Sequence, residues 1–300
     1  EQLERYRSTM MRLYPTSEVV VTAREPFPWN SQISSGGGGF SQVLRAMMQL
    51  RENDKVEKDV YYYGVFMPKD SMNAYCAGGC VTGLSTVVDD AGAAAMRASV
   101  GVGFAGQLAA NTMAHEIGHA HGRRHAPCGG TQGADPGFPY TGGKIGEWGY
   151  DIFAKKLIAP AKGTDIMGYC ANQWVSDYTY NALYDRIAAI SVERHRTPET
   201  RETRPTTSEK LARYRVATAL ESGDLTWDGE LDLDEELAGG VLRKANFLAD
   251  SGKTIITRTA RFFPFDHLPG GFVFVPADNG IEATKWKAVT VEGFTQTLAR

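Results

Sequence analysis

Four of the six histidines in this chain of 300 residues lie within one segment, residues 115–125, with the sequence HEIGHAHGRRH. Histidine fills protein cores less often than apolar residues do, and it is the commonest metal ligand among the side chains. The crowding therefore indicates chemistry at this segment, and the spacing of the histidines indicates which chemistry.

The spacing predicts three ligands for one cation. His115 and His119 are four residues apart, so on a helix they lie one turn apart on the same face. Gly122 can adopt a left-handed conformation that ends the helix, and His125 then arrives from a new direction as a third ligand. Three neutral imidazoles leave a fourth position open, which is the arrangement of a catalytic zinc rather than a structural one.

Two other residues of the segment are expected to play different parts. Glu116 lies beside the histidine pair, where it can contact a metal-bound water without being a ligand. His121 comes two residues after His119 and points away from it if the helix continues, so we expect a bystander. The alternative for the whole segment is a chance pair of histidines on a helix, and the correctly placed glycine and third histidine argue against it.

The pattern HExxHxxGxxH resembles the helix motif of the metzincin clan of zinc endopeptidases. The second signature of the clan is a methionine-containing turn beneath the metal, and the sequence DIMGY, with Met167, matches it. Tyr169 stands where astacin-like and serralysin-like members carry a tyrosine that approaches the zinc; a buried structural tyrosine is the alternative. The residue after the third histidine, Ala126, matches none of the well-known families, so no family within the clan is assigned.

The resemblance implies one catalytic Zn²⁺, bound by His115, His119 and His125. Zinc would lower the pKa of its bound water, and Glu116 would accept the proton and later deliver it to the leaving amine. Zinc, helped by Tyr169, would stabilise the oxyanion. The implied activity is hydrolysis of peptide bonds in protein or peptide substrates.

The resemblance also implies where a substrate would bind. In the clan an extended peptide pairs with an edge strand above the helix, and residues 98–104 (ASVGVGF) are expected to be that strand. The substrate-binding residues expected there are Val100, Gly101, Val102 and Gly103. Trp174, which follows the methionine turn, is expected to help form the wall of the specificity pocket.

The four cysteines form a short pair, Cys76 and Cys80, and a distant pair, Cys128 and Cys170, neither with the spacing of a zinc ribbon. We expect two disulfides rather than free buried thiols, which would place the protein outside the cytoplasm. Because the methionine turn runs just below the metal in the clan, the resemblance implies a Cys128–Cys170 bond and leaves Cys76 to pair with Cys80. The rival pairing joins Cys76 or Cys80 to Cys128, and spacing alone does not exclude it.

The composition is that of a soluble globular protein, and the net charge of -3 with no strongly basic half argues against a nucleic-acid or anionic-membrane partner. Residues 91–114 are apolar but are interrupted by Arg97, Gln107 and Asn111, so they are not a membrane span. The first residues are charged and predict an amphipathic helix rather than a signal peptide. We therefore expect a secreted or periplasmic monomer, in a mature form without its signal and any pro-segment.

Residues 1–192 are expected to form an α/β (α+β) metzincin-like catalytic domain with a twisted mixed sheet and an active-site helix. Residues 17–27, 59–68 and 97–106 have the β-branched or apolar character of strands. Residues 175–190 predict a helix with Ser176 or Asp177 as its cap.

Residues 193–208 are charged and contain threonine and proline, so they are expected to be a linker. Residues 209–300 contain short apolar strands separated by turn residues, which predicts a small all-β, sandwich-like module. An acidic run at 221–236 makes a Ca²⁺ loop conceivable, but it lacks the spacing of an EF-hand, so a solvated loop is favoured.

Three functions compete on this evidence. The leading one is a secreted zinc endopeptidase, and a narrower version is a metalloprotease directed to glycoproteins or surface proteins by the C-terminal module. The third, from a different class, is a non-catalytic binding or adhesion protein on a metzincin scaffold. The presence of Glu116 argues against the third, because an inactive descendant has no need of the base.

Overall fold

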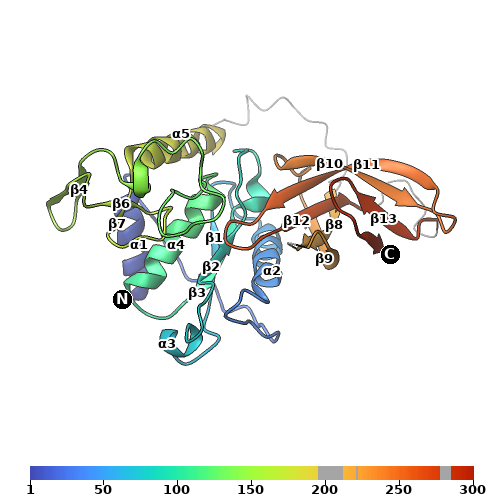
Figure 1. Ribbon diagram of the computed structural model, residues 1–300, viewed down its shortest axis with the longest axis horizontal. Helices are drawn as coiled ribbons and strands as arrows, with labels where there is room; N and C mark the ends of the chain where they lie inside the picture. Colours follow the sequence, from blue (N-terminus) through green and yellow to red (C-terminus); the bar gives the residue numbers. More distant parts are fainter. Residues whose placement is uncertain (195–211, 221, 278–284) are drawn as a thin grey trace.

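The computed structural model describes residues 1–194, 212–220, 222–277 and 285–300. The part up to residue 194 is a mixture of helices and small sheets, and the part from residue 212 is one large antiparallel sheet (Figure 1). A mixed α/β part followed by an all-β part is the arrangement that the sequence predicts. The predicted linker, residues 193–208, begins at the end of the last helix and otherwise lies outside the described residues.

A three-stranded sheet lies at the centre of the first part. Its strands are β1 (Tyr62–Phe66), β2 (Gly83–Ser85) and β3 (Ala98–Val102), in the order β1-β3-β2. β3 is parallel to β1 and antiparallel to β2. Helices α2 (Phe40–Asn53) and α4 (Gln107–Ala120) both pack against β3 and flank the sheet in Figure 1, so all five residues of β3 are buried.

The prediction that residues 98–104 form an edge strand is wrong. β3 has a hydrogen-bonded neighbour on each side, so the backbone of Val100, Gly101 and Val102 is not free to pair with a peptide. Gly103 follows the strand, and its amide donates to the carbonyl of Phe66 at 2.8 Å. The edge strand on the α4 side of the fold is β2, whose three residues are too few to show a pattern in the sequence.

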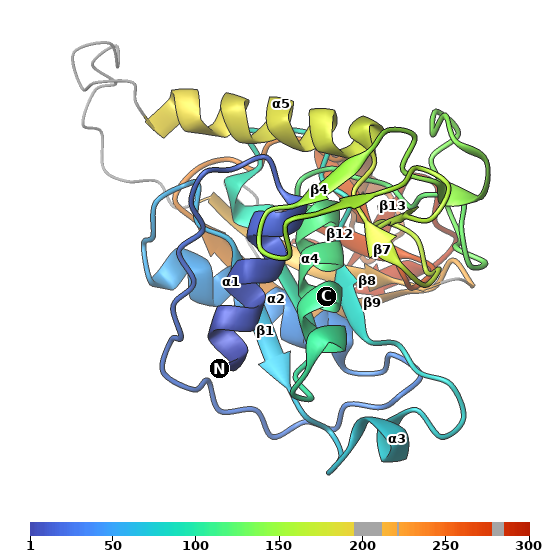
Figure 2. The ribbon, with the colours of Figure 1, turned by 90° about the vertical axis from the view of Figure 1, so that its left-hand side faces the viewer.

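Helix α1 (Gln2–Leu13) is the predicted amphipathic helix at the start of the chain. It lies alongside α4, as Figure 2 shows, and buries Tyr6, Met10 and Leu13 in the core. Just after it, the hydroxyl of Tyr14 donates to the carbonyl of Ala114 at 2.6 Å, which ties the two helices together. The apolar face of this amphipathic helix therefore covers α4.

The remaining elements of the first part are short, apart from one helix. They are α3 (Met72–Tyr75), η1 (Ala94–Met96), η2 (Thr141–Gly143), the pair β4 (Gly149–Asp151) and β5 (Lys156–Ile158), the pair β6 (Thr164–Asp165) and β7 (Gln173–Trp174), and α5 (Asp177–Arg194). Ser176 caps α5, because its Oγ accepts from the amide of Thr179 at 3.1 Å. Of the two predicted caps, Ser176 makes this bond.

Residues 17–27 are the clearest local disagreement with the sequence, because no strand is present there. Val19 and Val21 pack against the core while Val20 is 75% exposed, which is the alternation of an extended chain. The segment makes apolar contacts with the core but does not pair with a neighbouring strand in the described part of the chain. Alternation predicts an extended backbone, but only tertiary structure supplies a partner for its hydrogen bonds.

The second part is a seven-stranded, antiparallel sheet in the order β14-β13-β10-β11-β12-β8-β9. Its strands are β8 (Ala212–Ala219), β9 (Leu225–Leu233), β10 (Val241–Leu248), β11 (Thr254–Pro264), β12 (Gly271–Pro276), β13 (Ala288–Val291) and β14 (Thr297–Ala299). The two ends of the sheet meet, because the indole N–H of Trp227 donates to the carbonyl of Ala299 at 2.6 Å. The predicted sandwich of two sheets is therefore replaced by one curled sheet, which encloses its own apolar cluster around Phe247 and Val273.

The acidic run at residues 221–236 is largely a strand rather than the expected solvated loop. β9 runs through it, and Leu225, Leu231 and Leu233 are buried while the acidic residues between them are more exposed. The alternation of leucine with charged residues is that of a strand with one solvent-facing side.

The two parts share one hydrophobic core. A single cluster joins Phe40, Leu44 and Met48 of α2 to Phe263 and Phe274 of the C-terminal sheet. In Figure 1 the turn between β11 and β12 extends from the sheet toward the first part, and Phe265 forms an antiparallel bridge with Thr86, just beyond β2. The C-terminal sheet therefore contacts the residue that follows β2, and β2 itself packs against α4.

Candidate metal centre

Helix α4 holds His115 and His119 one turn apart, with both residues buried. The helix ends at Ala120, and Gly122 adopts a φ of 85°, in the left-handed region that favours glycine. The chain turns back there and brings His125 beside the first two rings. The ring centroid of His125 lies 5.3 Å from that of His115 and 4.6 Å from that of His119.

A backbone carbonyl fixes the orientation of each of these imidazoles. The Nδ1 atoms of His115, His119 and His125 lie 2.6, 2.6 and 2.7 Å from the carbonyl oxygens of Ile166, Arg123 and Gln132, respectively. Because a carbonyl only accepts, Nδ1 carries the hydrogen and Nε2 keeps a free lone pair. This second bond is typical of histidines that bind a metal through Nε2.

The Nε2 atoms converge on one small space. Nε2 of His119 lies 3.0 Å from Nε2 of His115. Burial lowers the pKa of His115 well below its usual range, lowers the pKa of His119 to about 3 and also lowers the pKa of His125. The three rings are therefore neutral at neutral pH, the form in which imidazole binds a cation.

Glu116 faces the same space from α4. The residue is fully buried, and neither carboxylate oxygen has a hydrogen-bond partner among the described residues. Burial raises the pKa of Glu116 well above its usual range, and the nearby carboxylate of Asp266 raises it further. A buried carboxylate without partners is costly unless a cation or a proton balances it, so the site is suited to a positive ion.

The methionine turn lies directly below α4. Met167 is buried against Gly118, and the amide of Ala126 donates to the Met167 carbonyl at 2.9 Å. The buried carboxylate of Asp165 supports the turn, accepting from the amides of Met167 and Ser176 at 2.8 Å each. The structure therefore places Met167 against Gly118 of α4, the helix that carries His115 and His119.

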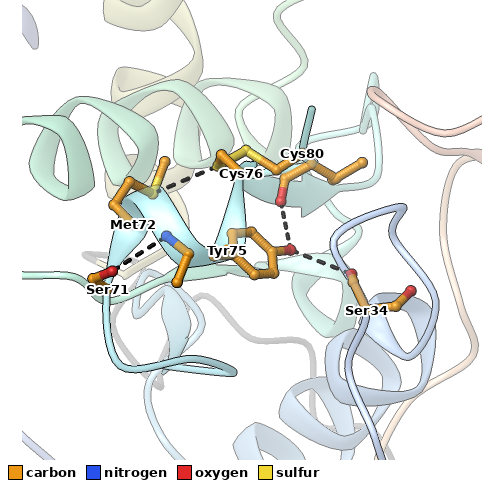
Figure 3. The surroundings of a disulfide bond; sticks show 8 residues. Ser34, Ser71, Met72, Tyr75, Cys76 and Cys80 are labelled. Atoms are coloured by element: carbon orange, nitrogen blue, oxygen red, sulfur yellow. Dashed lines mark hydrogen bonds between the residues drawn. A yellow bond between two sulfur atoms is a disulfide. The ribbon is translucent and has the colours of Figure 1, made fainter. Parts of the chain in front are cut away.

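The cysteines are paired as the resemblance implies. Cys128 is bonded to Cys170, which joins the chain leaving His125 to the chain leaving the methionine turn. Cys76 is bonded to Cys80 (Figure 3). Tyr75, beside this second disulfide, donates to the carbonyl of Val81 at 2.9 Å just before β2. The rival pairing with Cys128 does not occur.

Tyr169 lies at the rim of the cluster. Its hydroxyl is 3.0 Å from Nε2 of His125, and 42% of the residue is exposed. Burial of the hydroxyl and the nearby carboxylates of Asp266 and Glu116 raise the pKa of Tyr169 above its usual range, so the hydroxyl stays protonated. A protonated phenol at this distance can donate a hydrogen bond into the site.

His121 and Trp174 lie away from this space. His121 stacks on Tyr61 with ring centroids 4.2 Å apart, and its Nδ1 is 2.8 Å from the carbonyl of Ile117. Trp174 is only 7% exposed and packs in the core cluster that contains Met167. His121 therefore lies where a bystander is expected, whereas Trp174 fills the core and offers little surface to a substrate.

Two residues that the sequence did not bring to attention complete the cluster. Asp266 and His267, in the turn between β11 and β12, each place a ligand atom within 4.8 Å of those of the three histidines. Oδ2 of Asp266 lies 3.3 Å from Nε2 of His119, and Nδ1 of His267 contacts the same oxygen. The only signal in the sequence was an adjacent aspartate and histidine in a turn rich in glycine and proline.

The carboxylate of Asp266 is ionised in this setting. Burial alone would raise its pKa, but the imidazoles of His267 and His119 hold the pKa well below its usual range. His267 also lies 3.5 Å from Oε1 of Glu116 and stacks on Tyr169 with ring centroids 5.3 Å apart. The cluster therefore combines four imidazoles with the carboxylate of Asp266, which is a donor set that binds a dication.

This geometry defines a buried site that could hold a metal ion. Residues 87–184, which include the three histidines of the motif, Glu116 and the methionine turn, match the model of a family described as Peptidase M66, a family of zinc metallopeptidases. The match ends before the C-terminal sheet. No curated protein and no solved structure matches the chain. The match and the site together indicate a zinc peptidase.

None of the helices in the described part of the chain is both long enough and apolar enough to cross a membrane.

Proposed function

We propose that the protein is a secreted zinc endopeptidase of the metzincin type, which hydrolyses peptide bonds of protein substrates. The observation that carries the proposal is the convergence of the Nε2 atoms of His115, His119 and His125 beside the buried carboxylate of Glu116, which has no hydrogen-bond partner among the described residues. The match to a zinc metallopeptidase family supports it. The two disulfides support secretion, because such bonds persist in oxidising compartments.

The donor set suits zinc. Three histidine nitrogens with one open position are the ligands of catalytic zinc sites, and each ring here is already oriented by a carbonyl. Neither oxygen of Glu116 has a hydrogen-bond partner in the described part of the chain, and a dication in the cluster would balance this buried carboxylate. When bound, zinc would supply a Lewis acid that polarises a peptide carbonyl and lowers the pKa of water.

The residues around the cluster have separate tasks in the proposed reaction. Glu116 faces the space with free lone pairs and would accept a proton from water, then pass it to the leaving amine. Tyr169, protonated and at the rim, would donate to the oxyanion.

The experiment that tests the proposal is cleavage of unfolded casein, with zinc content measured in the same samples. Glu116→Gln is expected to lower turnover by a factor on the order of 10² to 10⁴ while one zinc per chain stays bound. Glu57→Gln, at an exposed glutamate, is the matched control and should leave turnover unchanged. A zinc-loaded wild type that cleaves nothing would instead favour the binding protein on a metzincin scaffold.

A further inference from the structure

The turn between β11 and β12 is built into the core on one side and into the metal site on the other. Phe265 is 8% exposed and belongs to the cluster that joins the two parts of the chain. Its amide donates to the carbonyl of Gly270 at 3.1 Å, which closes the turn. Directly after this anchor come Asp266 and His267, so the C-terminal sheet fixes where their side chains lie.

The same turn covers part of the edge of β2. The amide of Val102 donates to the carbonyl of Thr82, so Thr82 faces β3 and the alternate residues, Gly83 and Ser85, turn their backbone groups outward. Asp266 forms hydrogen bonds with both outward-facing backbone groups of Ser85. Its Oδ1 accepts from the Ser85 amide at 2.8 Å, and its own amide donates to the Ser85 carbonyl at 3.2 Å.

The contact continues beyond Ser85 as an isolated antiparallel bridge. Thr86 bridges Phe265, and the amide of Val87 donates to the carbonyl of Pro264 at 3.1 Å. A peptide that binds by strand addition would need the same outward groups. β2 also borders the reacting groups, because a Cβ on Gly83 would collide with Oε1 of Glu116.

The carboxylate of Asp266 also lies at ligand distance from the cluster. Two ligands of a tetrahedral zinc are about 3.3 Å apart when each bond is about 2.0 to 2.1 Å. Oδ2 of Asp266 is 3.3 Å from Nε2 of His119, and its side chain is fully buried. The contact of His267 with this oxygen is the kind of second hydrogen bond that orients a ligating carboxylate.

From these two observations we propose that Asp266 is a fourth protein ligand of the metal, and that the Pro264–Asp266 segment acts as an internal competitor of peptide substrates. The segment occupies two places that a substrate would need, the outward backbone groups of Ser85 at the end of β2 and the remaining position on the metal. The inference rests on the proposed function.

Exchange at the metal does not require the C-terminal sheet to detach, whereas opening the edge beside Ser85 requires the backbone of the Pro264–Asp266 segment to move. The shared core anchors the sheet through Phe265, whereas the carboxylate of Asp266 can leave the cluster by rotation of one side chain. Catalysis would then begin with exchange of Asp266 for substrate. The resting enzyme would be held back by its own C-terminal part.

The ligand assignment is tested with Asp266→Asn, which keeps the size of the side chain and an oxygen for the Ser85 amide. The control is Asp250→Asn, the same change at an exposed aspartate in the turn between β10 and β11. Zinc affinity, measured by competition with a chromophoric chelator, should fall at least tenfold in Asp266→Asn and stay unchanged in the control. An affinity within twofold of the wild type would overturn the ligand assignment.

The competitor role is tested on the cobalt-substituted proteins and on turnover. Acetohydroxamate should alter the visible spectrum of Co²⁺ at lower concentration in Asp266→Asn than in wild type, because the position is no longer shielded. At saturating zinc, casein hydrolysis by Asp266→Asn should rise severalfold. A lower turnover with zinc bound, or equal responses to acetohydroxamate, would overturn the competitor role.

Two further variants separate a failure of the Asp266 proposal from a failure of the metal site and from misfolding. His119→Ala should lose zinc, and if it kept full zinc the metal centre itself, and with it the proposed function, would be wrong. If Asp266→Asn does not fold, Asp266→Glu replaces it, since the added methylene moves the carboxylate without removing its charge. That variant should show the same direction of change in zinc affinity, and an unaltered affinity would count against the proposal.

Discussion

Gly118 of helix α4 lies so close to Met167 of the turn below that a Cβ atom on the glycine would be 2.5 Å from the methionine sulfur. The helix that carries two of the predicted ligands and the turn beneath them are therefore in contact at a position with no side chain. The Nδ1 of His115 lies 2.6 Å from the carbonyl of Ile166, one residue before the methionine. The packing of Gly118 thus bears on the orientation of a ligand.

Gly118→Ala is predicted to destabilise the protein although alanine favours helices. Helix propensity alone would stabilise the variant by about 1 kcal/mol, but overpacking in a core typically costs roughly 1 to 3 kcal/mol. We expect a lower free energy of unfolding in urea and weaker zinc binding. Gly36→Ala, where the added carbon meets nothing within 4 Å, is the control and should be neutral or slightly stabilising. A stabilised Gly118→Ala would contradict the packing argument.

The local part of the site could be predicted because it depends on short distances along the chain. His115 and His119 fall on one face through the helical period, and Gly122 marks the turn toward His125. These relations involve only a few bonds, so residue type and spacing determine them.

Asp266 and His267 could not be predicted, because their place depends on how a distant sheet packs against α2 and β2. The same limit explains the misplaced edge strand. The apolar and β-branched residues of segment 98–104 predict a strand, but whether a strand lies at an edge depends on the order of strands in the assembled sheet. Burial by a curled sheet and burial by a sandwich likewise require the same alternation of residues, so the sequence does not distinguish them.

Tyr169→Phe is predicted to lower turnover without removing zinc. The hydroxyl lies 3.0 Å from Nε2 of His125 and is the donor at the rim of the cluster, so its loss should weaken oxyanion stabilisation. We expect a fall in kcat on the order of 10- to 100-fold with little change in KM, measured on a peptide substrate. Tyr150→Phe, at an exposed tyrosine of β4, should have no effect. Equal rates in the two variants would reduce Tyr169 to a structural role.

The two disulfides are predicted to differ in their contribution to stability. Cys128–Cys170 has a sequence separation of 42 and Cys76–Cys80 a separation of 4. In the chain-entropy model the longer loop contributes about 4 kcal/mol and the shorter about 2 kcal/mol. The double serine variant of the first pair should therefore unfold at lower urea concentration than that of the second pair. It should also release zinc more readily, because the bond joins the chain after His125 to the methionine turn.

Equal losses of stability in the two double variants would contradict this prediction. Unchanged release of zinc from the Cys128/Cys170 variant would show that hydrogen bonds alone hold the turn. The candidates are the bonds from Ala126 to Met167 and from Tyr169 to Cys128, each 2.9 Å long.

The bystander histidine is predicted to make stability depend on pH. Burial, with smaller effects of the charges on Arg186 and Arg97, lowers the pKa of His121 to about 4. In the unfolded chain the pKa of histidine is about 6.5, so between these two values the unfolded chain binds more protons than the folded one. The contribution of neutral His121 to the free energy of unfolding is therefore fully present above pH 6.5. It should fall by up to roughly 3 kcal/mol as the pH decreases to about 4.

The variant His121→Phe isolates this effect. Phenylalanine can keep the stacked contact with Tyr61 but binds no proton, so its stability should decline less steeply below pH 6.5 than that of the wild type. The measurement is urea unfolding of both proteins from pH 4.5 to 7.5 under identical metal conditions. Any constant cost of losing the hydrogen bond to Ile117 shifts the whole curve of the variant and leaves its slope unchanged. Parallel curves for the two proteins would show that His121 does not change protonation on unfolding, and the buried neutral ring would then need another explanation.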